Sequence, residues 1–195
     1  MEPENTLQTK KKPEIIVFAG PNGSGKTTVT QYSKIIEPYI NADDIKKVNN
    51  LNDIEAALLA EKMREQCVED LHGFTFETVL STDRNLKLLR KAKDKGYFIR
   101  CIYVLTSNPE INVLRVKSRA AFGGHDVPEE KIRTRYAKAL NLIPDLVDIC
   151  DVIHIYDNSK YPFRIFKKRK DQQFIWPNKY WDEEKITELV SRRHQ

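Results

Sequence analysis

The chain has few cysteines and no long apolar run. Its 195 residues include Cys67, Cys101 and Cys150, which are widely spaced and form no pair at a metal-binding spacing. We therefore expect free thiols, buried as such residues usually are. The apolar runs, such as the one around Ile15–Ala19, are far too short to cross a bilayer. Residues Met1–Pro13 lack the apolar centre of a signal peptide, so a cytoplasmic protein without membrane contact is expected.

The sequence also lacks internal repeats, linkers and low-complexity tracts. Hydrophobic residues make up 40% and charged residues 31% of it, which is typical of a globular protein. We predict a flexible segment over residues 1–13 and one domain over 14–195, with 159–195 as a C-terminal appendage. The net charge of +5 favours anionic partners. A solvated hairpin tip explains the dense run Lys167–Lys170 as well as a binding patch would, and we do not expect a nucleic-acid partner.

Strand-like and helix-like segments alternate along the chain. Short apolar runs predict five strands: Glu14–Ala19, Tyr39–Asn41, Phe74–Phe76, Tyr97–Leu105 and Val152–Tyr156. Helices are expected over Lys26–Ser33, Asp53–His72, Asp83–Lys95, Asn108–Ala121 and Glu129–Cys150, the last one kinked or divided by Pro144. This alternation predicts an α/β fold with a five-stranded parallel sheet covered by helices on both faces. A β-hairpin over Tyr161–Trp176 and a closing helix over Asp182–Arg193 should follow.

A phosphate-binding motif stands at the end of the first predicted strand. The pattern G-x-x-x-x-G-K-[ST] is matched at every fixed position by Gly20, Pro21, Asn22, Gly23, Ser24, Gly25, Lys26 and Thr27, with Thr28 next. Glycines let backbone N–H groups converge on phosphate oxygens, and the following helix adds positive potential at its N-terminus. Lys26 then reaches the β- and γ-phosphates, and the Thr27 hydroxyl ligates Mg²⁺. The motif therefore predicts a P-loop NTPase fold that binds ATP with Mg²⁺.

The loop alone does not say what receives the γ-phosphate, because kinases, motors and switches all use it. No run of four apolar residues clearly ends in the acidic Mg²⁺ ligand of motor ATPases. The nearest, Val152–Tyr156 before Asp157, is expected to be the last strand of the sheet, near the nucleotide base. A switch-type Asp-x-x-Gly is also missing. Both absences disfavour motor ATPases and GTPases.

Two carboxylates follow neighbouring strands, where the strand ends face the substrate crevice of an α/β sheet. Asp43 follows the second strand and Glu77 ends the third. A kinase acting on a hydroxyl needs a carboxylate to orient it and accept its proton, and Asp43 is placed for this. Glu77 would hold substrate hydroxyls or a Mg²⁺-bound water. Alternatively, Asp43 caps a helix that starts near Asp44, and Glu77 caps the next helix.

Arginines flank a glycine pair in the second half of the chain. Arg115 and Arg119 are spaced i, i+4 and share a helix face, and Arg133 and Arg135 follow Gly123-Gly124. We interpret this segment as a mobile cover whose arginines neutralise the transferring phosphoryl group and exclude water. Alternatively, they are exposed, solubilising arginines.

Four motifs in order, GPNGSGKTT, INADDI, FTFETVLST and RAAFGGHDVPEEKIRTRY, resemble the zeta toxin family of P-loop kinases over roughly Glu14–Asn158. The resemblance implies transfer of the ATP γ-phosphate to a hydroxyl, in that family the 3′-hydroxyl of the amino sugar in UDP-N-acetylglucosamine. It implies that Lys26 and Thr27 bind the phosphates and the metal, and that Asp43 is the base. An antitoxin-like protein partner is also implied.

The resemblance assigns further roles and shows departures. It implies that Glu77 positions the substrate, that Thr78 or Ser81 stands near the family's substrate-binding threonine, and that Arg119 is the first of two phosphate-binding arginines. Where the family has the second, this chain has His125, a candidate substrate ligand. The family's E-G-T is here Glu77-Thr78-Val79. The hairpin Phe163–Trp176 has no counterpart in the resemblance.

The leading prediction is an ATP-dependent kinase for a hydroxyl-bearing small molecule, with a UDP-amino sugar as a candidate acceptor. A kinase for a nucleoside, nucleotide or other metabolite is the alternative within the same class. A nucleotide-binding regulatory module and a nucleic-acid-end-processing ATPase are alternatives from other classes.

Overall fold

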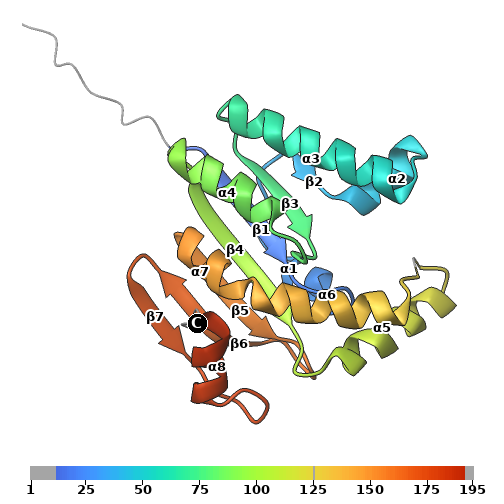
Figure 1. Cartoon of the computed structure of the whole chain (residues 1–195), viewed down its shortest axis with the longest axis vertical. Coiled ribbons are helices and arrows are strands. Elements are labelled where there is room, and N and C mark those ends of the chain that lie inside the picture. Colours follow the sequence, from blue (N-terminus) through green and yellow to red (C-terminus); the bar gives the residue numbers. More distant parts are fainter. Residues whose placement is uncertain (1–11, 125, 192–195) are drawn as a thin grey trace, which may run out of the picture.

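The fold is built on one seven-stranded sheet, seen in the computed structural model of the chain (Figure 1), which describes residues 12–124 and 126–191. The strands lie in the order β2-β3-β1-β4-β5-β6-β7. Their bounds are β1 Glu14–Ala19, β2 Tyr39–Ile40, β3 Phe74–Thr78, β4 Phe98–Leu105, β5 Val152–Asp157, β6 Phe163–Arg169 and β7 Gln172–Ile175. The first five are parallel, as predicted, and the predicted hairpin adds two antiparallel strands to the same sheet. The sequence analysis expected Val152–Tyr156 to be the last strand of the sheet. That expectation is wrong, because β6 pairs with β5 and β7 pairs with β6.

Helices occupy most of the connections. Their bounds are α1 Lys26–Thr30, α2 Ala42–Asn49, α3 Asp53–Glu69, α4 Arg84–Asp94, α5 Pro109–Ala121, α6 Glu129–Asn141, α7 Ile143–Ile149 and α8 Glu183–Val190. Pro144 lies in the first turn of α7, where its missing N–H costs no helical hydrogen bond, so it divides the predicted helix as expected. The helix after the phosphate motif is shorter than the predicted Lys26–Ser33. Among the helices of the described ranges, none has the length and apolar character needed to cross a membrane.

The two faces of the sheet are covered unequally because the connections run in two directions. After β2, each step between parallel strands moves the same way across the sheet, and right-handed crossovers then place α3, α4 and α7 on one face. The main core lies there, and it includes residues of α8 as well. Figure 1 shows these helices in front of the strands. The step from β1 to β2 runs the other way, so the five-residue α1 lies on the second face, which carries less helical cover than expected.

The three cysteines are free thiols, as predicted. Cys101 and Cys150 are buried in the main core, whereas Cys67 is only partly buried. Burial raises the pKa of the Cys101 thiol, which keeps it protonated and unreactive at neutral pH.

Candidate active site

The phosphate motif forms a turn that only glycine tolerates. Gly20, Gly23 and Gly25 have φ angles of +143°, +74° and +84°. A Cβ atom on Gly20 would lie 2.0 Å from the carbonyl oxygen of Val104, and one on Gly23 would lie 2.5 Å from that of Asn112. Because these neighbours are backbone atoms, they cannot move aside cheaply. The glycines of the motif are therefore required by the shape of the turn.

Side chains from distant segments hold this loop in place. Asn158 donates its side-chain N–H to the Ser24 carbonyl at 2.9 Å, and Asn112 donates to the Asn22 carbonyl at 2.6 Å. Arg115 donates to the Ser24 carbonyl at 3.5 Å. Arg115 thus lies beneath the loop instead of in the predicted cover. No local pattern could have identified Asn112 and Asn158, because their partners are backbone groups 90 and 134 positions away.

Asp157, which the sequence places before the loop-supporting Asn158, has a structural role. It is 2% exposed and accepts hydrogen bonds from the Ser159 N–H at 3.0 Å and the Asn178 side chain at 3.0 Å. These bonds fix the chain around Asn158 and join it to the segment before α8.

Lys26 lies between the loop and a carboxylate. Its side chain is 10% exposed, its ammonium donates to the Gly20 carbonyl at 3.0 Å, and it stands 3.6 Å from the Glu77 carboxylate. Burial lowers the pKa of Lys26, and the nearby Glu77 opposes this shift by favouring the charged form. Thr27 and Thr28 follow at the start of α1 with exposed side chains.

A cleft of about 350 Å³ opens beside the loop. The predicted site residues that line it are Asn22, Gly23, Lys26, Asp43, Glu77, Thr78, Ser81 and Arg119. Its lining carries five cations and three acids: Lys26, Lys46, Arg64, Arg119 and Arg135 against Asp43, Asp53 and Glu77. This balance favours an anionic occupant.

Asp43 faces the cleft because another residue caps its helix. Asn41 is the N-cap of α2, and its side chain accepts the Asp43 N–H at 2.9 Å. The alternative that Asp43 caps this helix is therefore wrong. Its carboxylate lines the cleft from the first turn of α2, with an exposed side chain.

Glu77 ends β3 and is oriented by Tyr39. The Tyr39 hydroxyl donates to the Glu77 carboxylate at 3.1 Å, and burial together with this carboxylate raises the pKa of Tyr39 to about 12. The alternative that Glu77 caps the next helix is wrong, because α4 begins at Arg84 behind Asp83. Thr78 accepts a 2.8 Å hydrogen bond from the side chain of Asn85, which also lines the cleft.

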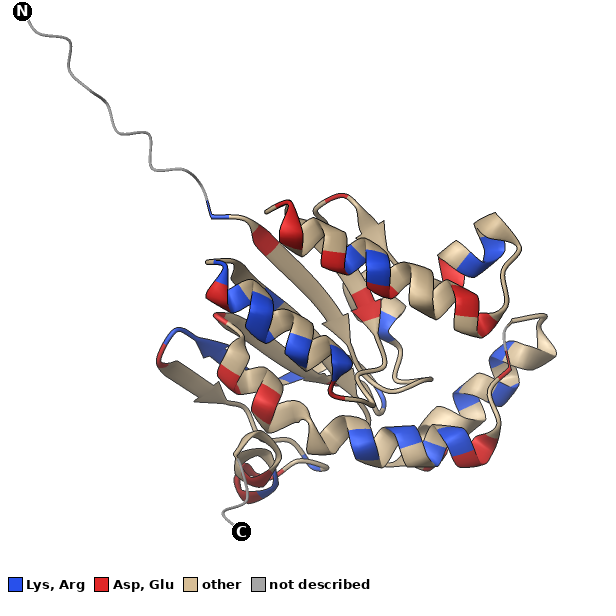
Figure 2. Ribbon diagram, turned by 45° about the horizontal axis from the view of Figure 1, so that its top comes forward, with Lys and Arg blue, Asp and Glu red and all other residues tan. Residues whose placement is uncertain are grey.

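The arginines of the predicted cover divide into two groups. Arg119 and Arg135 line the cleft, and Arg135 donates to the Asn22 side chain at 3.3 Å. Arg133 instead forms surface ion pairs with Glu110 at 2.7 Å and Glu129 at 3.0 Å. Figure 2 shows the basic residues along α5 and α6. His125 lies outside the described residues, so its predicted role stays a prediction.

Arg64 of α3 is a cleft residue that the sequence analysis missed. It is only 8% exposed, its guanidinium lies 5.2 Å from the centre of the Phe76 ring, and the described residues give it no ion pair. Its Nε has no hydrogen-bond partner among the described residues. Burial lowers the pKa of Arg64, because desolvation disfavours its charged form. An unpaired buried cation of this kind favours an anionic ligand.

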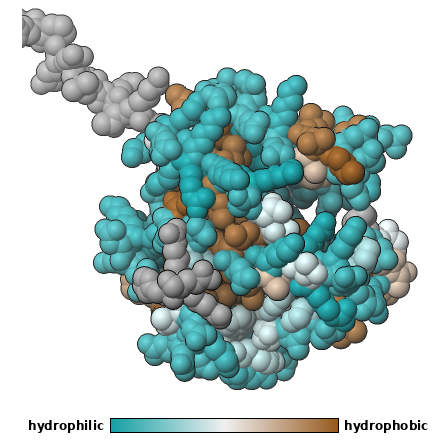
Figure 3. Space-filling view, viewed as in Figure 1, coloured by the Kyte–Doolittle hydropathy of each residue, from teal (hydrophilic) through white to brown (hydrophobic). Residues whose placement is uncertain are grey.

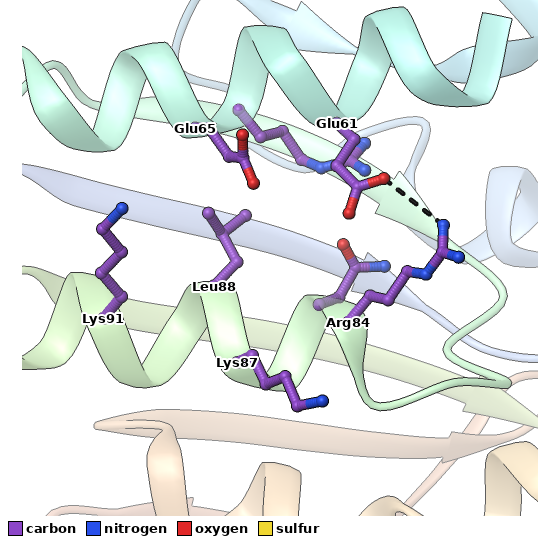
Figure 4. A pocket seen from close by; sticks show the side chains of 8 residues that line it. Glu61, Glu65, Arg84, Lys87, Leu88 and Lys91 are labelled. Atoms are coloured by element: carbon purple, nitrogen blue, oxygen red, sulfur yellow. Dashed lines mark ion pairs between the residues drawn. The ribbon is translucent and has the colours of Figure 1, made fainter. Parts of the chain in front are cut away.

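A smaller pocket of about 220 Å³ adjoins the cleft between α3 and α4 (Figure 4). Arg64 and Asn85 line both spaces. Figure 4 shows Glu61 and Glu65 on α3 facing Arg84 and Lys91 on α4, with Arg84 and Glu61 3.5 Å apart. The pocket contains no residue predicted for catalysis, so we place the chemistry in the larger cleft.

The described residues contain no group of three His, Cys, Asp or Glu side chains suited to a metal ion. Such a site still suits Mg²⁺ that enters with nucleotide phosphates, because Mg²⁺ keeps several waters and needs only one or two protein ligands. Thr27 supplies a hydroxyl at the end of the loop, and Asp43 and Glu77 supply carboxylates in the cleft.

Comparisons with known proteins support this fold. No family model matches the chain. The chain is 30% identical over 127 residues to an uncharacterized protein of Haemophilus influenzae, a match that covers 62% of this chain and 91% of that protein.

Two solved structures share the fold. A chain of the AvrRxo1-ORF1:-ORF2 complex crystallised with ATP matches with a TM-score of 0.72 and 12% identity, over 92% of this chain and 64% of that one. This chain thus spans less than two thirds of that protein. The PezAT toxin–antitoxin system of Streptococcus pneumoniae gives a TM-score of 0.54 and 21% identity, over 84% of this chain and 75% of that one. The predicted zeta-toxin-like P-loop kinase fold is confirmed.

The first of these matches extends beyond the expected region of resemblance. The sequence resemblance ends near Asn158. Even with the first 13 residues included, residues 1–158 are only 81% of the 195-residue chain, whereas the match with the AvrRxo1 complex covers 92% of it. Part of the hairpin and closing helix therefore has a structural counterpart, although the sequence resemblance offered none.

Proposed function

We propose that this chain, which belongs to the same family as the Haemophilus influenzae protein, is an ATP-dependent kinase for a hydroxyl of a small anionic molecule. One observation carries the proposal: Lys26 of the phosphate loop and the carboxylates Asp43 and Glu77 line a single cleft. The similar AvrRxo1 complex was crystallised with ATP, which supports this nucleotide as the donor. A loop without an acceptor-side carboxylate would suit a binding module, whereas this arrangement suits phosphoryl transfer.

The proposed reaction moves one phosphoryl group and one proton. The acceptor oxygen bonds to the γ-phosphorus while the bond from that phosphorus to the bridging oxygen of ADP breaks, and the hydroxyl proton passes to Asp43. Lys26 neutralises the β- and γ-phosphates. Arg119 and Arg135, which reach the cleft from α5 and α6, stabilise the charge that develops on the transferring group.

Mg²⁺ belongs to the proposal as the partner of ATP, where it would neutralise the phosphates and align the leaving group. The Thr27 hydroxyl would hold it at the end of the phosphate loop. Glu77 would act on the acceptor side, where Tyr39 fixes its orientation.

The acceptor is proposed to lie along α3. Ala56, Ala57, Ala60 and Arg64 line this side of the cleft, so a nearly flat helix face ends at a buried cation. From Ala56 to Arg64 the helix rises about 12 Å, roughly the length of a sugar with one or two phosphates. A nucleotide sugar such as UDP-N-acetylglucosamine fits this arrangement of an anionic end and a hydroxyl end.

A matched pair of variants tests the proposed base. Asp43→Asn removes the carboxylate from the cleft, whereas Asp44→Asn makes the same change at the next residue, which does not line it. We expect acceptor-dependent ADP release to fall about 100- to 10,000-fold in Asp43→Asn, with ATP affinity nearly unchanged. Asp44→Asn should keep its activity. Normal turnover by Asp43→Asn, with a panel of UDP-sugars, nucleosides and sugars, would remove Asp43 as the base.

We also propose that a protein partner binds beside the cleft. The two similar complexes contain partner proteins, and apolar side chains lie at the surface where α2 meets α3 (Figure 3). Val48, Ile54 and Leu58 are 84%, 73% and 56% exposed there. If the activity needs neutralising, expression in a bacterial host should arrest growth, and the Asp43→Asn protein should not. Equal growth with both proteins would argue against a toxic activity in that host and against the need for such a partner.

A further inference from the structure

The second face of the sheet carries rows of basic and aromatic side chains. Strand alternation and register place two rows of side chains on this face, each running across β4, β5, β6 and β7. One row runs Ile102, His154, Lys167, Phe174, and the next runs Val104, Tyr156, Arg164, Trp176, the last residue following β7. The basic residues of β6 are visible in Figure 2.

This face has little helical cover among the described residues. The core residues of β5 and β6, such as Ile155 and Phe166, point to the other face, where α7 and α8 lie. On the second face α1 packs against β1 and β4. Phe174 is 43% exposed, and its neighbours Tyr156 and Trp176 are partly exposed. The aromatic rings are therefore accessible to a ligand.

The charge of this face is one-sided. Arg164, Lys167 and Arg169 form no ion pair with any described residue, and Glu14 is engaged by Arg100 at 3.0 Å. The Arg164 guanidinium donates to Nδ1 of the His154 ring at 3.4 Å. Burial and the neighbouring Arg164, Lys167 and Arg100 lower the pKa of His154 to about 4, as expected where positive charge is not balanced.

Cations and rings are paired on the face. The Arg164 guanidinium lies 4.5 Å from the centre of the Trp176 ring, and the Lys167 ammonium lies 5.7 Å from that of Phe174. Phe174 and Trp176 are 6.0 Å apart with nearly parallel planes. In such an arrangement the cations can bind the phosphates of a nucleic-acid strand, and its bases can stack on the aromatic rings.

We propose that this sheet face binds single-stranded nucleic acid. Single strands are recognised by grooves that combine positive charge with rings on which bases stack, and an open sheet face displaying both is one such surface. An acidic protein would satisfy the cations but leave the rings without matching partners. The unbalanced charge of Arg164, Lys167 and Arg169 thus argues for phosphates, and the interleaved rings argue for bases.

The surface differs from the sequence run Lys167–Lys170 that suggested a solvated tip. Lys168 points to the opposite face, where it donates to the Val147 carbonyl, and Lys170 lies in the turn between β6 and β7. Only alternate residues of the run reach the proposed surface, which explains why a linear reading of the charges did not reveal it. This proposal goes beyond the kinase function and does not depend on it.

Fluorescence anisotropy of the full chain, without ATP, tests the proposal with 12-nucleotide oligouridine and oligodeoxythymidine. We expect binding that weakens with salt, with a slope of about −2 in log–log form for three phosphate contacts. The double variant Arg164→Gln/Lys167→Gln should bind about tenfold more weakly or worse. Phe174→Ala, which removes one ring, should also weaken binding. The matched control, Lys62→Gln with Lys138→Gln, removes the same charge from exposed positions on α3 and α6 and should bind like the wild type.

A second readout does not depend on variants. Cross-linking of 4-thiouridine oligonucleotides to the wild-type chain should place adducts on Tyr156, Phe174 or Trp176. Three results would overturn the proposal: no binding at about 100 µM oligonucleotide, an equal loss of affinity in both double variants, or adducts confined to the cleft. An equal loss would mean that the oligonucleotide responds only to the net charge of the protein, as in non-specific binding. Binding of phosphatidylserine vesicles in place of oligonucleotides, lost in the Arg164/Lys167 variant, would identify a membrane surface and also overturn it.

Discussion

The two sides of the active-site cleft are held in different ways. On the nucleotide side, the loop carbonyls accept hydrogen bonds from Asn112, Asn158 and Arg115, and its glycines fit against neighbouring backbone. On the acceptor side, Asp43 is exposed on α2, and a partly exposed ion pair between Lys46 and Asp53 joins α2 to α3. The fold therefore shapes the phosphate site before any ligand binds, whereas the choice of acceptor depends on side chains that are less constrained.

The largest effect is expected from disturbing the constrained side. Gly20→Ala would place a Cβ 2.0 Å from the Val104 carbonyl oxygen at a φ of +143°. Backbone strain and overpacking should together lower the free energy of unfolding by about 2–5 kcal/mol and abolish ATP binding. Urea denaturation and nucleotide titration measure both quantities.

Gly96→Ala is the matched control for this change. Gly96 also has a positive φ, +86°, but a Cβ there would meet no atom within 4 Å. Its cost should therefore be only the left-handed backbone strain, about 1 kcal/mol, with ATP binding retained. Equal losses in the two variants would show that the loop is not held against β4 as described.

A smaller and more selective effect is expected on the acceptor side. Arg64→Leu removes the buried cation from the cleft and should raise KM for an anionic acceptor about 10- to 100-fold, as expected for a charged hydrogen bond. KM for ATP should stay unchanged, and Arg64→Lys should recover part of the loss. Steady-state kinetics with charged and uncharged acceptors provide the measurement.

Arg84→Leu is the control, because Arg84 carries the same charge nearby but forms only a surface pair with Glu61. It should have little effect on either KM. The anionic-acceptor interpretation fails if Arg64→Leu changes KM equally for charged and uncharged acceptors.

The smallest effect is expected from the hydrogen bond that orients Glu77. Tyr39→Phe removes the donor 3.1 Å from this carboxylate and keeps the ring against Phe18. One hydrogen bond corresponds to about a 2- to 10-fold loss in kcat/KM. A loss as large as that of Asp43→Asn would mean that Glu77, not Asp43, is the main catalytic carboxylate.

The sequence predicted the nucleotide side better than the acceptor side, for a physical reason. Local chemistry dictates the turn at Gly20–Gly25, so its motif can be recognised in one short segment. In the sequence, Arg64 looks like an ordinary solvated arginine of a helix, and only the packing of α3 over Phe76 makes it a buried cation. Arg115 was expected in the cover, because helix spacing gives a shared face but not which neighbour that face meets.

Fold features followed the same division. The parallel strands β1 to β5 were predicted from local patterns, and Pro144 divided a helix as expected. The attachment of β6 to β5 was not predicted, since strand pairing depends on contacts distant in sequence. Asn41 was likewise not recognised as the cap of α2, because neighbouring Asp43 suits a cap equally well by residue type.

The most direct test of the kinase proposal follows the fate of the γ-phosphate. Purified chain is incubated with γ-³²P-labelled ATP, Mg²⁺ and a panel of UDP-sugars, nucleosides and metabolites, and the labelled products are separated. We expect label in a phosphomonoester of an anionic acceptor with wild-type protein and with Asp44→Asn, but not with Asp43→Asn. Label found only in inorganic phosphate, at equal rates with and without every acceptor, would contradict the account and indicate an ATPase.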